Sequence, residues 1–277
     1  MNILVCIKQV PNTQEISIDP ETNTLIREGI ESILNPYDGY ALEAAARLKD
    51  KNKDIRICAL CMGPPQAEAA LRECLSTSAD VAYLASDKFF AGSDTLATSY
   101  ILSEAIKKIE SLEGIKFDLI FCGKQAIDGD TAQVGPQIAE CLDYPQITYA
   151  LTCEIKDGEL HVLKETEDGK EILAVNFPCL VTFTKPNFEP RLASAKRKFA
   201  AKKMEIRRIG VADLCGIDRS KIGLKGSPTQ VRKTYVPLVK KGGTVFRDGP
   251  PGEAAAKLAK LLVDNTVVKD IEQEDKL

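Results

Sequence analysis

Short apolar runs alternate with amphipathic segments along the first 145 residues. The runs are "NILVCIKQV", "DIRICALCMG", "DVAYLAS" and "FDLIFCG", and helix-like segments such as "QAEAALRECLSTSA" and "DTLATSYILSEAIKKIESL" stand between them. Runs rich in Val, Ile and Leu that lack polar alternation are typical of parallel strands covered on both faces. The alternation therefore predicts a doubly wound, mostly parallel α/β sheet in three layers, Rossmann-like or flavodoxin-like.

The pattern changes after residue 145. "ITYALTCEIKDGELHVLKET" and "EILAVNFPCLVTFTKP" are rich in strand formers and carry "KDGE" and "EDGK" turn signals. We expect antiparallel or edge strands added to the same sheet, and a further hairpin in "EISIDPETNTLIRE" near the N-terminus. The sequence predicts an α/β domain over residues 1–205 with a crevice large enough for a nucleotide. Residues 206–277 are expected to form a C-terminal arm, whose last helix, "PGEAAAKLAKLLVDN", packs on another surface or on another chain.

Composition excludes several classes of protein. The chain has 277 residues and a formal net charge of -3, so its electrostatics favour no nucleic-acid partner. Its nine cysteines lie mostly in apolar runs, as expected of core thiols in a reducing compartment. The start of the chain has no signal-peptide pattern and no apolar run is long enough to span a bilayer. We expect a cytoplasmic protein with no membrane partner.

Catalytic and metal-binding patterns are weak. Cys58 and Cys61 form a CxxC, but residues three apart on a strand point to opposite faces. His161 is the single histidine and lies in the alternating run "ELHVLKE", so a base for nucleophilic catalysis is missing. The basic run from Lys196 to Lys203 is typical of a solvated helix face and is also compatible with docking of an acidic partner. We predict no catalytic residue and no metal site.

Ligands of an open parallel sheet bind beyond the carboxyl ends of the strands, where the strand order reverses. Three loops are expected there: residues 7–11, 61–65 and 123–136. Asn35, a suitable N-cap followed by a proline, and Asp38 begin a helix that could face the same crevice.

The third loop, "GKQAIDGDTAQVGP", has two possible interpretations. Its three glycines would let the backbone approach an anion, and the helix that we expect from about Val134 would present free N–H groups. Asp128 and Asp130 argue against a phosphate because they would repel it, and Lys124 is the one nearby cation. By residue chemistry alone an ordinary turn is the simpler interpretation, since the loop matches no established phosphate-binding motif.

Several stretches together resemble the beta subunit of electron transfer flavoprotein. They are "VCIKQVP", "NPYD", "CMGPPQA", "GKQAIDGDTAQVGP", "YPQITYA" and "EPR" leading into "AAKK", in the family's order from residue 3 to about 203. The resemblance implies a heterodimer with a larger alpha subunit that carries FAD, and a beta subunit that holds an adenine nucleotide. It implies an electron carrier subunit rather than a free-standing enzyme.

Carried over position by position, the resemblance implies a set of nucleotide-binding residues, with Asp130, Thr131, Gln133 and Val134 nearest the phosphates. The set is Cys6, Asn35, Asp38, Met62, Gly123, Gln125, Asp128, Asp130, Thr131, Ala132, Gln133, Val134 and Gly135. This chain departs from many ordinary members at Ala132 and Val134, where side-chain donors are lost, and at Phe188. It also has Ala195 and Lys196 in place of the leucine-proline pair that grips acyl-CoA dehydrogenases.

Other stretches, "DPETNTLIREG", "GLKGSPTQV" with "TYVP", and the last helix, resemble the electron-bifurcating type of anaerobes. That type implies FAD in the beta subunit, NADH as transient donor, ferredoxin or flavodoxin as one acceptor, and an acyl-CoA dehydrogenase-like partner as the other. Two alternatives stay open: an AMP-binding beta subunit of a simple electron shuttle, and a non-redox adenine-nucleotide-binding regulatory protein.

Overall fold

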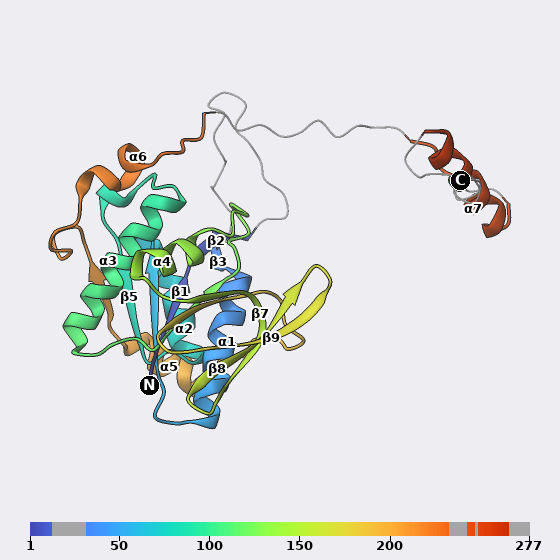
Figure 1. Cartoon of the computed structure of the whole chain (residues 1–277). Coiled ribbons are helices and arrows are strands. Elements are labelled where there is room, and N and C mark those ends of the chain that lie inside the picture. The colour runs from blue at the N-terminus through green and yellow to red at the C-terminus, as the bar shows by residue number, and fades with distance from the viewer. Residues whose placement is uncertain (13–31, 233–242, 247–248, 266–277) are drawn as a thin grey trace. The chain divides into compact units, whose positions relative to one another are not determined.

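A long central sheet organises the chain (Figure 1). The computed structural model describes residues 1–12, 32–232, 243–246 and 249–265. Within these residues the sheet has nine strands. Their spatial order is β11 (Ile206–Ile209), β5 (Val81–Ala85), β4 (Arg56–Met62), β1 (Asn2–Ile7), β6 (Leu119–Gly123), β10 (Cys179–Phe183), β7 (Gln146–Lys156), β8 (Glu159–Thr166) and β9 (Gly169–Val175).

The strand order reverses beside β1. Strands β11 to β7 pair in parallel, whereas β7, β8 and β9 form an antiparallel meander at one end. The chain runs outward from β1 to β4 and β5, and then returns to the other side of β1 as β6. The carboxyl ends of β1 and β6 therefore flank the topological switch point, where an open α/β sheet binds its ligands. The doubly wound α/β architecture is confirmed.

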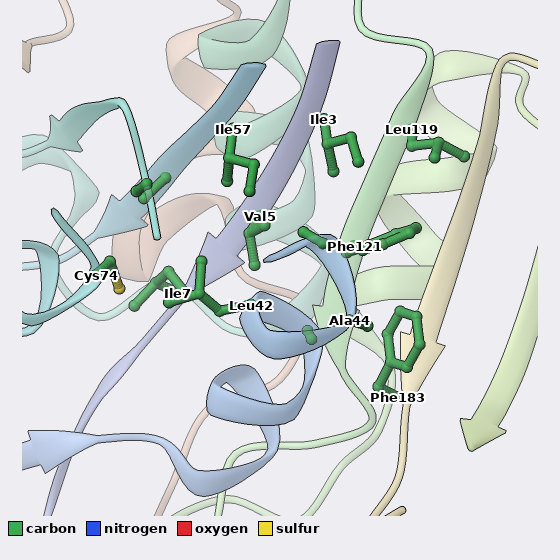
Figure 2. Close-up of a cluster of buried hydrophobic side chains, with 14 of the residues drawn as sticks. Ile3, Val5, Ile7, Leu42, Ala44, Ile57, Cys74, Leu119, Phe121 and Phe183 are labelled. Atoms are coloured by element: carbon green, nitrogen blue, oxygen red, sulfur yellow. The ribbon is translucent and has the colours of Figure 1, made fainter. Parts of the chain in front are cut away.

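The side chains of alternate residues of β1 point into two separate hydrophobic cores, one on each face of the sheet. Ile3, Val5 and Ile7 belong to one cluster of buried side chains, which includes residues of α1 (Pro36–Lys51) and α2 (Glu68–Thr77) (Figure 2). Leu4 and Cys6 belong to the other, with residues of α3 (Thr95–Glu113) and α4 (Val134–Leu142). Cys58 and Cys61 fall in different cores, so the prediction that this CxxC points to opposite faces is confirmed.

The β-rich second half differs in part from expectation. β8 and β9 are antiparallel additions, as predicted, but β10 lies inside the sheet and pairs in parallel with both β6 and β7. The residues of β10 are all buried, because helices cover both of its faces. The sheet also extends past residue 205, since β11 pairs in parallel with β5. The hairpin predicted in residues 15–28 lies outside the described residues, between the short antiparallel strands β2 (Gln9–Pro11) and β3 (Ser32–Leu34).

A buried carboxylate anchors the segment that follows β10. Glu43 of α1 is 5% exposed and accepts bonds from Arg191, at 2.7 Å from Nε and 3.1 Å from the backbone N–H. Arg47 donates to the same carboxylate at 3.0 Å, and its guanidinium stacks over the ring of Phe188 at 3.8 Å. Burial acts to raise the pKa of Glu43, but hydrogen bonds and charge from Arg191 outweigh it and lower the pKa. The clamp holds the segment that leads into α5 (Ala195–Lys203) against α1.

Hydrogen bonds from arginine side chains to backbone carbonyls join the basic helix α5 to α2 and the residues after it. Arg72 of α2 donates to the carbonyl of Ala201, and Arg197 of α5 donates to the carbonyls of Leu75 and Ala79. The other basic side chains of α5 are exposed, as expected of a solvated helix face.

Two compact units divide the chain, Met1–Thr234 and Tyr235–Leu277. The first also contains the short helical turns η1 (Pro65–Ala67), η2 (Lys88–Phe90), η3 (Arg219–Lys221) and α6 (Gly223–Gly226). The second contains α7 (Pro251–Asp264). Among the described helices, none is both long and apolar enough to cross a bilayer.

Candidate functional site

A cavity of about 360 Å³ opens at the switch point of the sheet. The residues that end β1, β4 and β6 form its floor, among them Cys6, Met62 and Cys122. The first residues of α3 and α4 and the loop between β6 and α4 form its walls. Parallel strands that end together beside two helix N-termini create a site suited to an anionic ligand with an apolar body.

Asn35 fixes the loop that follows β6. The residue is 1% exposed, and its side chain donates to the backbone carbonyl of Gln125 at 2.9 Å and accepts from the N–H of Ile127 at 3.2 Å. Asn35 occupies the N-cap position of α1, as predicted, with proline next to it, but its side chain makes no capping bond. The amide bonds to the neighbouring loop instead, because the loop offers it both a donor and an acceptor.

Asp38 ties three segments together inside the protein. One carboxylate oxygen accepts from the N–H of Lys8 at 2.7 Å, and the other accepts from the side chain of Asn35 at 2.9 Å and the N–H of Gly123 at 3.1 Å. Asp38 is 6% exposed, and burial raises its pKa to about 7 although these hydrogen bonds act to lower it. The same carboxyl group thus joins the ends of β1 and β6 to the start of α1.

The backbone of the loop before α4 is unusual. Asp130 and Ala132 have φ of 52° and 53°, a conformation that is uncommon for residues other than glycine. Within the described part of the chain, none of the backbone N–H groups from Thr131 to Gly135 donates a hydrogen bond to the protein. Gln133, at the N-cap position of α4, accepts no capping bond. Five N–H groups beside a helix N-terminus are the donors that a phosphate requires.

The two acids of the loop have protein partners. Asp128 pairs with Lys8, whose Nζ lies 2.7 and 2.9 Å from the two carboxylate oxygens. Asp130 accepts from the side chain of Gln125 at 2.6 Å. Neither acid caps α4. The expected repulsion of a phosphate is therefore weakened, because Lys8 neutralises Asp128.

The cavity has a second cation besides Lys124. The prediction that Lys124 is the one nearby cation is wrong, because Lys8 also lines the cavity. The ammonium group of Lys124 lies 5.3 Å from the ring centre of Tyr37 and 5.5 Å from that of Tyr149. These aromatic faces attract the cation and hold it at the rim of the cavity.

Two of the three loop glycines, Gly123 and Gly135, are required by packing within the protein. A Cβ on Gly123 would lie 2.4 Å from a carboxylate oxygen of Asp38, and one on Gly135 would lie 2.7 Å from the methyl group of Thr182. A Cβ on Gly129 would meet nothing within 4 Å, so the surroundings of this residue would accept a side chain. The sequence suggests that these glycines allow close approach to an anion. At Gly123 and Gly135, contact with the protein itself already requires a residue without a side chain.

The structure gathers almost all of the predicted site residues. Asp128 does not line the cavity, and all the others do: Cys6, Asn35, Asp38, Met62, Gly123, Gln125, Asp130, Thr131, Ala132, Gln133, Val134 and Gly135. α4 begins at Val134, as expected.

Sequence reasoning missed the wall formed by α3. Ser93, Asp94, Thr95, Thr98 and Leu102 line the cavity there. Thr95 bonds to Gln133 at 2.9 Å, which joins α3 to the loop before α4. The signal was available, because residues 86–94 follow the carboxyl end of β5 just as the three selected loops follow other strands.

The pKa of Asp38 predicts how stability depends on pH. A carboxyl group whose pKa is about 7 when folded and near 3.8 when unfolded stabilises the protein fully below pH 3.8, and this stabilisation is lost as the pH rises towards 7. We expect the free energy of unfolding of the wild type, relative to Asp38→Asn, to fall between pH 4 and 7 by at most about 1.4 kcal/mol per pH unit. Denaturant titrations of both proteins measure this difference. A difference that is constant or rises with pH would contradict the assignment.

Comparison with known proteins identifies the family. Residues 22–214 match the model of the electron transfer flavoprotein domain. The electron transfer flavoprotein subunit beta of Megasphaera elsdenii is 48% identical over 275 residues, which cover 99% of each chain. The caffeyl-CoA reductase-Etf complex subunit CarD of Acetobacterium woodii is 45% identical, over 97% of this chain and 100% of its own. Protein FixA of Azotobacter vinelandii is 45% identical, over 99% of this chain and 98% of its own. This chain therefore belongs to the electron transfer flavoprotein family, among its beta subunits.

Proposed function

We propose that this chain is the FAD-binding beta subunit of an electron-bifurcating flavoprotein and holds the cofactor in the cavity at the switch point. The observation that carries the proposal is the row of N–H groups from Thr131 to Gly135, which face a cavity and have no partner among the described residues. Ala132, Val134 and Gly135 are half-buried or buried, and N–H groups in such positions are paired in nearly all native proteins. Without protein partners they call for an external acceptor, and phosphate oxygens, which can also reach the N–H groups of the exposed Thr131 and Gln133, fit that need.

The cavity suits the rest of an adenine nucleotide. Met62, Leu102 and Val134 offer apolar contacts for a flat base, and the side chain of Thr98 lines the cavity and offers a hydroxyl group to a ribose. Lys124 supplies positive charge at the rim of the cavity, and Lys8 offsets the negative charge of Asp128. When bound, FAD supplies the redox chemistry, whereas this chain binds it, orients it and sets its electrostatic surroundings.

The choice of FAD rests on the likeness to complexes of the bifurcating kind. The Acetobacterium woodii relative is named as a subunit of a caffeyl-CoA reductase-Etf complex. By analogy we assign NADH as the transient donor, ferredoxin or flavodoxin as one acceptor, and an acyl-CoA dehydrogenase-like partner, reached through the FAD of the alpha subunit, as the other. Ala132 and Val134 lack side-chain donors, so phosphate binding falls to the backbone N–H groups.

The nucleotide content of the complex tests the proposal. We expect the heterodimer, purified with its alpha subunit and denatured, to release two FAD and no AMP. Chromatography of the released nucleotides with absorbance detection gives the ratio. One FAD and one AMP would replace the proposal with a simple electron shuttle, and a colourless complex that releases ATP would indicate a non-redox regulator.

Substitutions at Ala132 test the backbone site. Ala132→Val places a β-branched residue at φ 53°, which costs about 1–2 kcal/mol and should pull the loop out of the conformation that aligns its N–H groups. We expect the purified complex to retain much less beta-subunit nucleotide. Ala132→Asn is the matched control, because asparagine tolerates this conformation, and it should retain the wild-type amount. Equal retention by the two variants would argue against backbone recognition at this loop.

We further propose that α7 packs on the alpha subunit. Ala255, Leu258, Leu261 and Leu262 recur at helical spacing, yet α7 has no buried residue, and Leu258 and Leu261 are 47% and 42% exposed. No described residue of the unit Tyr235–Leu277 buries this face, and an amphipathic helix gains stability from its apolar face only when another surface covers it.

Paired substitutions on the two faces of α7 test this interface. Leu258→Gln with Leu261→Gln should weaken the complex, because two apolar side chains would each lose burial worth about 1.5–3 kcal/mol. Lys257→Gln with Lys260→Gln makes the same number of changes on the polar face and should leave the affinity nearly unchanged. The dissociation constant of the heterodimer, measured by analytical ultracentrifugation, distinguishes the pairs. Equal affinities would show that the apolar face has another role.

A further inference from the structure

Two cysteines stand side by side at the floor of the cavity. β1 and β6 pair in parallel with Leu4 opposite Ile120 and Val5 opposite Phe121, so the next pair in this register is Cys6 and Cys122. Adjacent strands lie about 4.8 Å apart, and side chains in register point to the same face. Both cysteines belong to the core on the α3 and α4 side, which confirms their common face.

Both thiols belong to this core and also border the cavity. Cys6 is 8% exposed and Cys122 is 5% exposed, and both line the cavity wall. Interaction with the Cys6 thiol, together with burial, raises the pKa of Cys122 well above its ordinary value. Neutral thiols react slowly with alkylating agents, which attack the thiolate. Reagents that bind two thiols at once are favoured, since the second thiol is already in place when the first has reacted.

We propose that Cys6 and Cys122 form a vicinal dithiol site that binds trivalent arsenicals at the floor of the nucleotide cavity. For phenylarsine oxide, two As–S bonds form, the oxo oxygen leaves as one water molecule with both thiol protons, and arsenic stays trivalent. No oxidant or reductant is required. Arsenic is a soft acceptor, and thiol sulfur is the soft donor that it prefers.

Arsenic at this position competes with the nucleotide. The phenyl group of the reagent would project from Cys6 and Cys122 into the space that also borders Met62 and Val134. The competition rests on the proposed nucleotide site, whereas the dithiol itself rests only on the pairing of the two strands. A bound nucleotide should therefore protect the thiols.

The test uses the full-length chain after removal of bound nucleotide. With one equivalent of phenylarsine oxide, native mass spectrometry should show one adduct per chain that survives excess 2-mercaptoethanol and is reversed by dithiothreitol. Cys6→Ala and Cys122→Ala should each weaken retention about 100-fold, because each leaves a single thiol. The Cys58→Ala control removes a buried thiol that does not line the cavity and should keep the adduct. Circular dichroism verifies that all three variants are folded.

The outcomes distinguish a failure of the dithiol site from a failure of the proposed nucleotide site. An adduct that persists in both single variants, or its absence from the wild type, would overturn the dithiol site. Single adducts at the exposed Cys141 or Cys215 would be removed by 2-mercaptoethanol and count as absence. Equilibrium dialysis with AMP tests the nucleotide site by itself. If AMP binds but does not slow arsenical binding, the placement of the dithiol at the nucleotide cavity is overturned.

Discussion

The buried pair formed by Asn35 and Asp38 is the interaction on which the site depends. Asp38 receives N–H groups from the ends of β1 and β6, and Asn35 holds the loop beyond β6 by a donor and an acceptor. Two strands and a helix that are far apart in sequence are thus fixed at the point where the strand order reverses. In the low dielectric of the interior such a network is strong when every member is satisfied, and costly when one member is lost.

This arrangement explains how a loop with two acids can accept an anion. With residues Gln125 and Ile127 fixed, the chain passes through the left-handed conformation at Asp130 and Ala132 before α4 begins. Local strain of this kind persists where the surrounding structure determines it, and it is concentrated at functional sites. Lys8 neutralises Asp128, and the side chain of Gln125 donates a hydrogen bond to Asp130. Among the described residues, neither acid accepts a bond from the N–H groups of Thr131 to Gly135, so these donors are available to phosphate oxygens.

Hydrophobic periodicity is sufficient to predict the parallel strands and the position of the site. The carboxyl-end rule selects three of the loops that meet there, and proline at position 136 correctly sets the start of α4 near Val134. Contacts between residues far apart in the sequence are harder to predict. The turn signals before β10 favour an antiparallel or edge strand, although its apolar run "CLVTF" has the pattern of a strand covered on both faces. The pairing of Lys8 with Asp128 joins residues 120 positions apart, so a fixed charge partner could not be inferred from spacing.

The role of the glycines is equally hidden from the sequence, because Gly123 and Gly135 make room for Asp38 and Thr182, which no sequence neighbour reveals. The proposed nucleotide binding depends on the N–H groups from Thr131 to Gly135, which have no partner among the described residues. Backbone 1H–15N spectra of the deuterated full-length chain, recorded with and without AMP, measure them directly. We expect the amide protons of these residues to shift downfield as they bond to phosphate, while those of the distant strand β9 do not. Unchanged amide resonances in a chain that binds AMP would contradict backbone recognition of the phosphate.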